Sequence, residues 1–575
     1  MTKQILFAGI LCLVLAGTAQ VFAHEMPAHK AATAAQASPV ATLPHAAQEH
    51  DVHAESVADD DDGMVMLHPG LPETWLAVAV MVMFSIAIWS LMAPVPRATT
   101  ERAIDLAAVP VAGGVVRFLI RGPYPLLAGK VLSVVIFLLV LAAGFFGTVY
   151  PERNFATAFV WNLWWPLVVV SVLFVGTAWC AICPWDALAN WLVRRRWWRR
   201  ADPHPGLNLR VPRYLHNSWL ALLMFLLLTW LEIGFGVTTL PAATATMALM
   251  MLVLSVVFLL LFERKAFCRY ACPVGRTLGY YARLAPVAVR PVAQATCDAC
   301  KSLDCYNGSR EIEPCPTHLV VGRFSENTFC LSCGNCVQSC AQQNVSWWLR
   351  SPGSEAQSLA RPQWDGAWFM LALLGITTFH GLTMMPFWAD GAGAASNAVG
   401  ASGRPLCGFT LGMIGSLVLP VLIYGACVGV FHRVAGKAGA SYKTQFAAFS
   451  FAALPLAFTY HPAHNLDHLS RESSDVFSLL SDPLGNDAVR RTMAEIHVQM
   501  MAPLFSDDVM FALQAAVMVF GFWLAVQILR HRGRDERLVG SGGLRGWRLL
   551  PMLAFVAAIA AINLWLMAQD MEMRF

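Results

Sequence analysis

Charged side chains are scarce in this sequence. Asp, Glu, Lys and Arg make up 13% of its 575 residues, whereas 57% are hydrophobic and the mean hydropathy is +0.54. So little charge excludes an ordinary soluble enzyme or a disordered chain and favours a membrane protein with several spans. The net charge of +4 is too small to indicate nucleic-acid binding, and no glycine-rich phosphate loop follows a strand. Cysteine is abundant instead: twelve of the fifteen cysteines lie between Cys180 and Cys340.

The chain begins with the features of a secretory signal peptide over residues 1–23. Lys3 precedes an apolar run at 5–16, and Val-Phe-Ala at 21–23 offers a cleavage site; an uncleaved first helix is the alternative. We therefore expect residues 24–74 to form a periplasmic, low-complexity tail rich in His and Asp. The side chains of this tail suit either capture of copper or zinc or a plain solvated linker. They include His24, Met26, His29, His45, His50, His53 and His68.

Ten apolar runs after the leader are long enough to predict transmembrane helices. They lie near 75–92, 126–149, 160–178, 215–234, 242–262, 367–388, 406–431, 444–460, 509–529 and 549–568. With the tail outside, the loops on the inner side hold 31 Lys and Arg residues and the segments on the outer side hold 7. This asymmetry follows the positive-inside rule, so we predict a protein of the bacterial inner membrane with the loop at 263–366 in the cytoplasm.

The loop at 263–366 is too polar to span a membrane and is rich in Cys, Gly and Pro. From Cys330 to Cys340 its cysteines follow the Cys-x2-Cys-x2-Cys-x3-Cys spacing, which gives three thiolates to one iron–sulfur cluster and the fourth to a neighbouring one. Eight thiolates suit two [4Fe–4S] clusters, so we expect a bacterial-ferredoxin-like insert; two zinc sites are the alternative. The crossover rule assigns Cys297, Cys300, Cys305 and Cys340 to the first cluster, and Cys315, Cys330, Cys333 and Cys336 to the second.

Two Cys-Pro motifs stand where spans are expected to leave the membrane on the cytoplasmic side. In the first, Cys180 and Cys183 are separated by two residues; in the second, Cys268 and Cys272 are separated by three. Each motif follows an aromatic residue and precedes a basic, aromatic-rich stretch, which indicates an internal repeat. Such thiol pairs suit a dithiol redox relay, a soft-metal site or further cluster ligands, and buried structural cysteine is the alternative.

With these motifs, the chain resembles the membrane-bound polyferredoxins of the NosR, NapH and CcoG type over about residues 126–350. Cys268, Cys272 and the following proline match the family's Cys-x3-Cys-Pro motif, whereas Cys180 and Cys183 are one residue closer. The resemblance implies an electron-transfer component. Branches of the family serve nitrous oxide reductase, periplasmic nitrate reductase, or copper reduction during cytochrome oxidase assembly. We expect no periplasmic flavin domain of the NosR kind, because the segment before the first span is short and polar.

Histidines at the outer end of the eighth expected span predict a metal or cofactor site. His461, His464 and His468 recur at i, i+3 and i+7, which places three imidazoles on one helical face, and Asp467 is placed to orient one of them. Pro462 is expected to end the helix near His461, so the three residues need not share one helix. The outer loop at 461–508 adds two further candidate metal ligands, His497 and Met500.

Three interpretations of this outer face stay open beside ordinary interfacial histidines. They are a copper or other soft-metal site, axial ligation of haem b with His380 as partner, and a quinol pocket in which a histidine accepts the proton. Glu232, near the outer end of the fourth expected span, is a costly residue in a bilayer and so a functional candidate as well.

We therefore expect a membrane electron carrier with two cytoplasmic [4Fe–4S] clusters. Its partners would be a quinone pool or a cytoplasmic electron donor, and a periplasmic acceptor protein or metal ion, with copper reduction as the sharper hypothesis. The alternative is a metal-handling, transport or assembly factor whose clusters are regulatory. Transport would require acidic or histidine pairs along a path through the spans, and the spans contain few.

Overall fold

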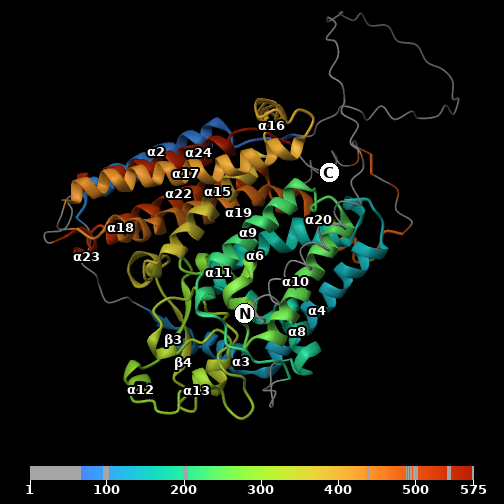
Figure 1. Ribbon diagram of the computed structural model, residues 1–575, viewed down its shortest axis with the longest axis vertical. Coiled ribbons are helices and arrows are strands. Elements are labelled where there is room, and N and C mark those ends of the chain that lie inside the picture. Colours follow the sequence, from blue (N-terminus) through green and yellow to red (C-terminus); the bar gives the residue numbers. More distant parts are fainter. Residues whose placement is uncertain are drawn as a thin grey trace, which may run out of the picture.

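The computed structural model is mostly α-helical (Figure 1). It describes residues 67–94, 103–197, 205–436, 439–486, 489, 491–492, 495, 503–540 and 546–572. The expected signal peptide and most of the expected tail lie outside these residues, as do the candidate ligands His497 and Met500. Those expectations stay predictions.

Seven helices in the described ranges are long and apolar enough to cross a membrane. Each coincides with one of the ten expected spans, so the mostly helical fold and seven of the expected long apolar helices are confirmed. In chain order they are α2 (Glu73–Met92), α4 (Pro123–Phe146), the continuous α5, η3 and α6 (Phe155–Val175), α10 (Pro241–Leu261), α17 (Pro405–Ala435), α22 (Asp507–Arg532), and η10 with α24 (Trp547–Met567).

The other three expected spans are helical but do not meet the same criterion of length and hydropathy. The span expected at 215–234 is α9 (Trp219–Gly234), which has 16 residues. The span expected at 367–388 is α15 (Trp364–Leu382), and the one expected at 444–460 is divided between α18 (Tyr442–Phe449) and α19 (Ala453–Glu472). The second half of α19 carries His, Asp, Arg and Glu side chains, which lower its hydropathy. Ten spans therefore stay a prediction.

Helix α19 does not end at Pro462, so that expectation is wrong. The helix runs from Ala453 to Glu472 with Pro462 inside it. It packs against α15, α22 and α24, and burial against these neighbours outweighs the penalty of about 3 kcal/mol that an interior proline imposes. His461, His464 and His468 therefore do share one continuous helix.

The insert is built around a small antiparallel sheet, at the bottom of the molecule in Figure 1. β3 (Val287–Pro291) pairs with one edge of β4 (Val345–Leu349), and β2 (Ile104–Asp105) pairs with the other. α3 (Ala112–Arg121) packs on a short helix of the insert. Residues 104–121 thus belong to this unit, although the sequence places them in a plain loop. Three short helices carry or adjoin the cysteines: α12 (Gln294–Asp298), α13 (Asp304–Asn307) and α14 (Asn335–Ser339).

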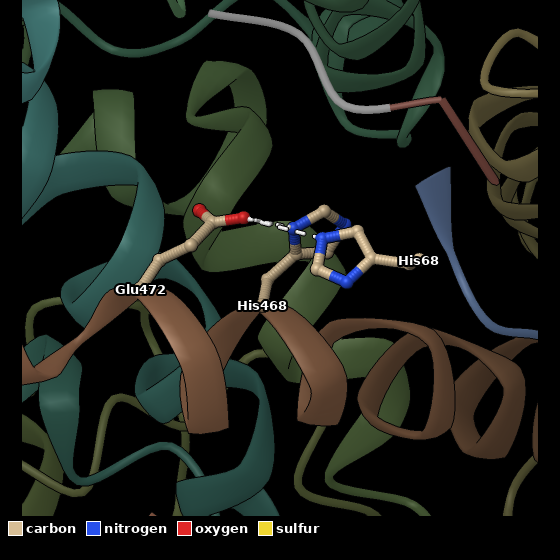
Figure 2. A group of neighbouring side chains, drawn as sticks. All are labelled: His68, His468 and Glu472. Carbon is tan, nitrogen blue, oxygen red and sulfur yellow. Dashed lines mark hydrogen bonds and ion pairs between the residues drawn. The ribbon is translucent and has the colours of Figure 1, made fainter. Parts of the chain in front are cut away.

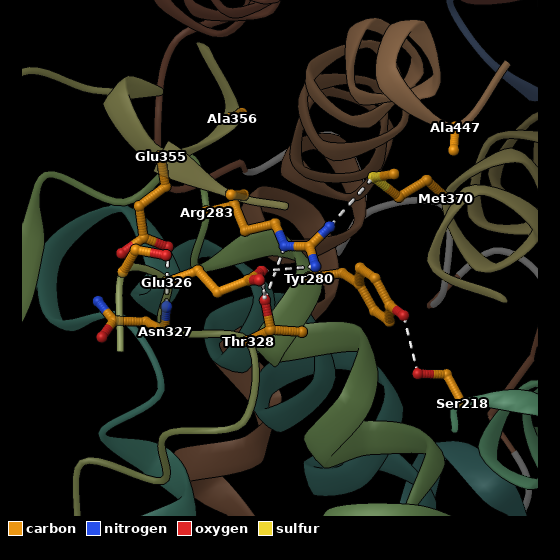
Figure 3. A network of polar contacts seen from close by, with 12 residues as sticks. Ser218, Tyr280, Arg283, Glu326, Asn327, Thr328, Glu355, Ala356, Met370 and Ala447 are labelled. Atoms are coloured by element: carbon orange, nitrogen blue, oxygen red, sulfur yellow. Dashed lines mark hydrogen bonds and ion pairs between the residues drawn. The ribbon is translucent and has the colours of Figure 1, made fainter. Parts of the chain in front are cut away.

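A buried arginine joins the insert to the helical bundle (Figure 3). Arg283 follows α11 (Pro273–Tyr281) and is only 1% exposed. Its Nε donates to Thr328 Oγ1 at 2.7 Å, its Nη2 lies 2.8 Å from Glu326 Oε2, and its Nη1 contacts the sulfur of Met370 on α15 at 3.6 Å. Because a buried guanidinium is costly unless its charge and its N–H groups are paired, these contacts fix the insert against the bundle.

The described N-terminal residues are paired with the C-terminal end of the chain. β1 (Leu67–His68) forms an antiparallel pair with β5 (Met571–Glu572), and the N–H of Leu71 donates to the Met567 carbonyl at 2.7 Å. A Cβ at Gly70 would come within 2.5 Å of the Ala568 backbone, so only glycine fits this close approach. We call residues 67–71 the N-terminal strap. It fixes His68 beside the C-terminal end of α19.

Candidate functional site

Each Cys-Pro motif forms a sharp turn into a helix that starts with the proline. In the first elbow, α7 (Trp179–Ile182) ends at Cys183, and α8 (Pro184–Arg194) follows. In the second elbow, the π-helical turn η5 (Phe267–Ala271) ends at Cys272, and α11 follows. Proline is favoured at a first helical position, because the N–H group that it lacks would have no partner there. The two elbows therefore have the same local architecture.

The elbows bring their four cysteines together. Cys272 interacts electrostatically with Cys180, Cys183 and Cys268, and Cys183 interacts with Cys180 and Cys268. The N–H of Gly275 donates to Cys272 Sγ at 3.3 Å. Burial raises the pKa of the Cys272 thiol, while this N–H bond and the partial positive charge of the helix N-terminus act in the opposite direction. We call Cys180, Cys183, Cys268 and Cys272 the elbow set.

The structure also groups Cys297, Cys300, Cys305 and Cys340, which we call the first insert set. Cys305 interacts electrostatically with the other three. Asn344 links two members, because its backbone N–H donates to Cys340 Sγ and its side-chain Nδ2 donates to Cys297 Sγ, both at 3.4 Å. Such N–H donors stabilise negative charge on cysteine sulfurs and tune cluster potentials.

A second insert set surrounds one small cavity. The thiol of Cys336 interacts electrostatically with those of Cys333, Cys330 and Cys315, and all four side chains line the cavity. The N–H of Ser332 donates to Cys330 Sγ at 3.4 Å. The second insert set is Cys315, Cys330, Cys333 and Cys336.

Left-handed backbone conformations occur beside the cysteines of both insert sets. Leu303, His318, Ser332 and Gln343 have φ values of 51°, 58°, 49° and 49°. A non-glycine residue held in this region costs about 1–3 kcal/mol and persists only where its surroundings enforce it. At Ser332 the conformation turns an N–H towards a cysteine sulfur. The loops are therefore shaped to face their sulfurs inward.

Buried cations lie next to the elbow set. Lys265 Nζ lies 2.5 Å from Asp186 Oδ2; burial opposes the charge, but this carboxylate raises the pKa of Lys265 above its usual range. Arg276 is fully buried, and its Nε and Nη2 have no hydrogen-bond partner among the described residues. Cys180 and Cys272 lie close enough to interact with it electrostatically. A buried guanidinium with unpaired N–H groups requires an anion nearby, and an iron–sulfur cluster with four thiolate ligands is one.

An apolar cavity of about 260 Å³ adjoins the elbows. Trp179, Pro184 and Pro273 of the elbows form part of its wall. Glu232 of α9 is the only acidic residue among those that line it. The carboxylate that the sequence analysis singled out as a functional candidate therefore faces this cavity. Four further tryptophans line the cavity: Trp161, Trp164, Trp165 and Trp185.

The predicted histidines of α19 have different neighbours. The ring of His461 lies 5.5 Å from that of Trp165, and His464 lies between His380, at 5.2 Å, and His468, at 5.5 Å, measured between centroids. The rings of His380 and His464 meet edge to face, at 85°. Axial haem ligands must instead point their nitrogens at one iron from opposite sides. The arrangement therefore does not favour haem b between these two residues.

His468 forms a polar cluster with two residues that the sequence analysis did not assign as its co-ligands, His68 and Glu472 (Figure 2). One ligand atom from each of the three lies within 4.8 Å of the other two. Burial alone would lower the pKa of His68, but its hydrogen bond with Asp467 and the nearby Glu472 carboxylate outweigh burial and raise the pKa to about 9. The i, i+4 spacing of His468 and Glu472 was visible in the sequence, whereas the approach of His68 depends on the strap.

A model of the 4Fe-4S binding domain family matches residues 157–201 and 244–289. The first match contains Cys180 and Cys183, and the second contains Cys268 and Cys272. The two Cys-Pro motifs that looked like a repeat therefore each lie in a matched segment of one iron–sulfur domain family.

Two curated relatives match parts of the chain. YccM of Escherichia coli (strain K12), named for a proposed role in electron transport, is 27% identical over 133 residues, which are 22% of this chain and 35% of YccM. The ferredoxin-type protein NapH of Haemophilus influenzae (strain ATCC 51907 / DSM 11121 / KW20 / Rd) is 31% identical over 99 residues, 16% of this chain and 33% of NapH. The matched segments thus span about a third of each relative. No solved structure matches the chain.

Both relatives and the family model point to the same group as the cysteine motifs, and both relatives are named as electron-transport or ferredoxin-type proteins. Over part of its length, the chain is therefore similar to NapH-type ferredoxin proteins and carries two segments that match an iron–sulfur binding domain family.

Proposed function

We propose that this protein links [4Fe–4S] clusters in the insert with a quinone pool through the elbow set. The observation that carries the proposal is the position of the elbow thiols. Cys180 has Cys330 of the second insert set as an electrostatic neighbour, and the adjacent Trp179 lines the apolar cavity. Iron–sulfur clusters supply one-electron transfer, while the protein holds them, excludes water and sets their potentials.

We assign one cluster to each insert set, with the ligands that the crossover rule predicts. The geometry favours this over zinc. Four thiolates bound to zinc at about 2.3 Å would bring their sulfurs to about 3.8 Å of one another. In the described part of the chain, one group of at least three His, Cys, Asp or Glu side chains has its ligand atoms within 4.8 Å of one another. That group is His68, His468 and Glu472. No three cysteine sulfurs in the described residues lie that close together, which favours the larger four-iron cluster over zinc.

We assign a third iron–sulfur centre to the elbow set. Its four thiols come from the two segments matched by the 4Fe-4S binding model, and Arg276 supplies an unpaired buried cation beside them. Arg269 of the second elbow also has two nitrogens without a hydrogen-bond partner among the described residues. The buried Arg276 and the partly buried Arg269 would compensate the negative charge that the cluster and its ligands carry.

The apolar cavity suits a quinone head group. Its wall is almost entirely aromatic or aliphatic, which matches an isoprenoid quinone that partitions in the bilayer. Oxidation of one quinol releases two electrons and two protons. Two one-electron centres take up the electrons, the Glu232 carboxylate is placed to accept one proton, and the second proton passes to water at the membrane surface. A cytoplasmic electron donor and a periplasmic acceptor would be the further partners.

The membrane arrangement proposed here has ten spans after a signal peptide, in the bacterial inner membrane. Helices α9, α15 and α18–α19 would complete the seven long apolar helices. The loops on the insert's side hold 31 Lys and Arg residues, and the segments on the other side hold 7. This asymmetry supports an insert in the cytoplasm and a C-terminal end of α19 on the outer side.

The test is anaerobic purification in detergent, followed by measurement of iron and acid-labile sulfide per chain and by EPR before and after dithionite reduction. We expect about twelve irons per chain and reducible cubane signals, since each of three centres holds four irons. The double variant Cys183→Ala with Cys272→Ala should lose about four irons, whereas Cys407→Ala, outside all three sets, should keep them all. About eight irons would overturn the third centre, and zinc without iron would overturn the whole proposal.

A second candidate, electron delivery to a metal such as copper on the outer face, is favoured by a series of aromatic rings. Trp164 lies 5.6 Å from Trp179 and 6.0 Å from Trp165, measured between ring centroids, and Trp165 lies 5.5 Å from His461. Rings at these separations are in contact, so they connect the first elbow with α19. If the dithionite-reduced protein, after removal of excess dithionite, does not convert Cu(II) to Cu(I), this candidate is wrong.

A further inference from the structure

We propose that His68, His468 and Glu472 form a binding site for a divalent first-row transition-metal ion. His468 Nδ1 lies 2.7 Å and His68 Nε2 lies 3.8 Å from Glu472 Oε1. Donor atoms around a tetrahedral zinc ion stand about 3.3 Å apart, given bonds of about 2.0–2.1 Å. The two measured separations lie on either side of that value, so small side-chain rotations suffice to form the site shown in Figure 2.

Asp467 holds His68 in the orientation that a metal ligand needs. Its Oδ2 lies 2.5 Å from His68 Nδ1, which leaves Nε2 as the nitrogen available to a metal. In metal sites, a ligating histidine commonly donates its other ring N–H to a carboxylate, which fixes the ring and raises its basicity. The second oxygen of Asp467 accepts a hydrogen bond from Arg471 Nε at 2.8 Å, so this carboxylate is already fixed in place. Asp467 is therefore a positioning residue and not a ligand.

His68 Nε2 makes only a long contact, 3.8 Å to Glu472 Oε1, which is beyond hydrogen-bond distance and leaves room for a ligand between the two atoms. The residue is 4% exposed, and its Nε2 has no hydrogen-bond partner in the described part of the chain. A buried polar atom without a hydrogen bond is costly, and a bound metal ion would give Nε2 a partner. His464, one turn before His468, is 3% exposed, and neither of its ring nitrogens has a hydrogen-bond partner among the described residues. Both features lie on the same side of α19.

The donor set determines the class of ion. Two imidazoles and one carboxylate are the set of catalytic zinc sites of the His2Glu type, in which the fourth position stays open. Imidazole donors favour zinc, copper, nickel and iron over magnesium and calcium. Glu472 and His468 are partly exposed, with 16% and 18% of their side-chain surface accessible, so an ion has access to the site. Asp507, bound to Arg471 at 2.6 Å, adds a further acidic group nearby.

The experiment titrates ZnCl2 into the full-length, iron-loaded protein in detergent, with bound zinc measured by equilibrium dialysis and iron measured in the same samples. We expect His68→Gln, His468→Gln and Glu472→Gln each to lose one bound zinc ion per chain relative to wild type, at unchanged iron content. Asp467→Asn should lower the affinity for the same zinc ion about 10–100-fold. Because each variant is compared with wild type, zinc bound at other places in the protein cancels out of the difference.

The matched control is His531→Gln, because His531 lies at the opposite end of α22 from Asp507, in contact with the Gln527 carbonyl. It should bind as much zinc as wild type. If the three ligand variants also keep all their zinc, or if His531→Gln loses as much, the proposal is overturned. Iron content reports separately on the proposed electron-transfer function, so the two can fail independently. Gly70→Ala is a further variant that leaves the ligands intact; displacement of the strap should remove the same zinc ion.

Discussion

Thr177 and Cys330 are 153 residues apart in the chain, yet the Thr177 hydroxyl donates a hydrogen bond of 2.8 Å to the Cys330 carbonyl. The same hydroxyl lies 2.9 Å from that of Ser332. Thr177 precedes the first elbow, and Cys330 begins the four-cysteine motif of the insert. One buried side chain thus sets the spacing between two groups of thiols that we assign to successive redox centres.

Thr177→Val should disturb electron transfer between these centres without removing them. Valine has nearly the same shape but leaves the Cys330 carbonyl without its donor, which costs about 1–3 kcal/mol of stability. We expect full iron content, a shifted midpoint potential for the second insert cluster in an EPR redox titration, and a lower melting temperature. Thr246→Val is the control, because that hydroxyl bonds only to its own helix, at Ala242. An unchanged potential would show that the contact is merely structural.

Gly322→Ala should remove the first insert cluster. A Cβ at this position would come within 2.5 Å of Cys297 Cβ and 3.2 Å of its Sγ, so the cysteine must move. We expect a loss of about four irons per chain, with the signals of the other centres retained. Gly391→Ala is the matched control, since a Cβ there meets nothing within 4 Å. Full iron content in the Gly322 variant would contradict the assignment of Cys297 to a cluster.

Arg283→Met should loosen the insert from the helical bundle. The change removes the cation that pairs with Glu326; because the Glu326 side chain is 15% exposed, the cost should fall below the roughly 3–5 kcal/mol of breaking a fully buried ion pair from one side. Limited proteolysis should then cut the insert at lower protease concentration than in wild type. Arg323→Met, at an exposed position in the same insert, should leave the pattern unchanged. Equal resistance of both variants would show that Arg283 does not hold the insert.

The sequence predicted the local features of this molecule well. Apolar runs located the seven long helices, because that signal depends on neighbours a few positions away, whereas the assignment of the insert cysteines to two clusters stays a prediction. The course of α19 through Pro462 was not predictable in this way, since packing against distant helices overrides the local preference. The same holds for Arg276 beside the elbow thiols and for His68, whose position depends on pairing between the two ends of the described chain.

Glu232→Gln should show whether the clusters are reduced by quinol oxidation in the cavity or only store electrons from another donor. In an anaerobic stopped-flow experiment, a water-soluble quinol such as menadiol should reduce the clusters of the wild-type protein, which bleaches their visible absorption. Glu232→Gln keeps the shape of the side chain but removes the group that accepts a proton in the cavity. We expect the reduction by quinol to slow about 10²–10⁴-fold, as loss of a general base does elsewhere, while reduction by dithionite stays as fast.

Glu73→Gln is the matched control, because Glu73 is an exposed residue in the first turn of α2 and does not line the cavity. It should leave both reduction rates unchanged. If Glu232→Gln reacts with quinol as fast as wild type, the carboxylate is not the proton acceptor. If the wild-type clusters do not react with quinol at all, the cavity does not serve a quinone, and electrons must then reach the insert from a cytoplasmic donor. Iron content reports on the clusters, whereas the rate of reduction by quinol reports on the cavity. The quinone assignment can therefore fail while the cluster assignment holds.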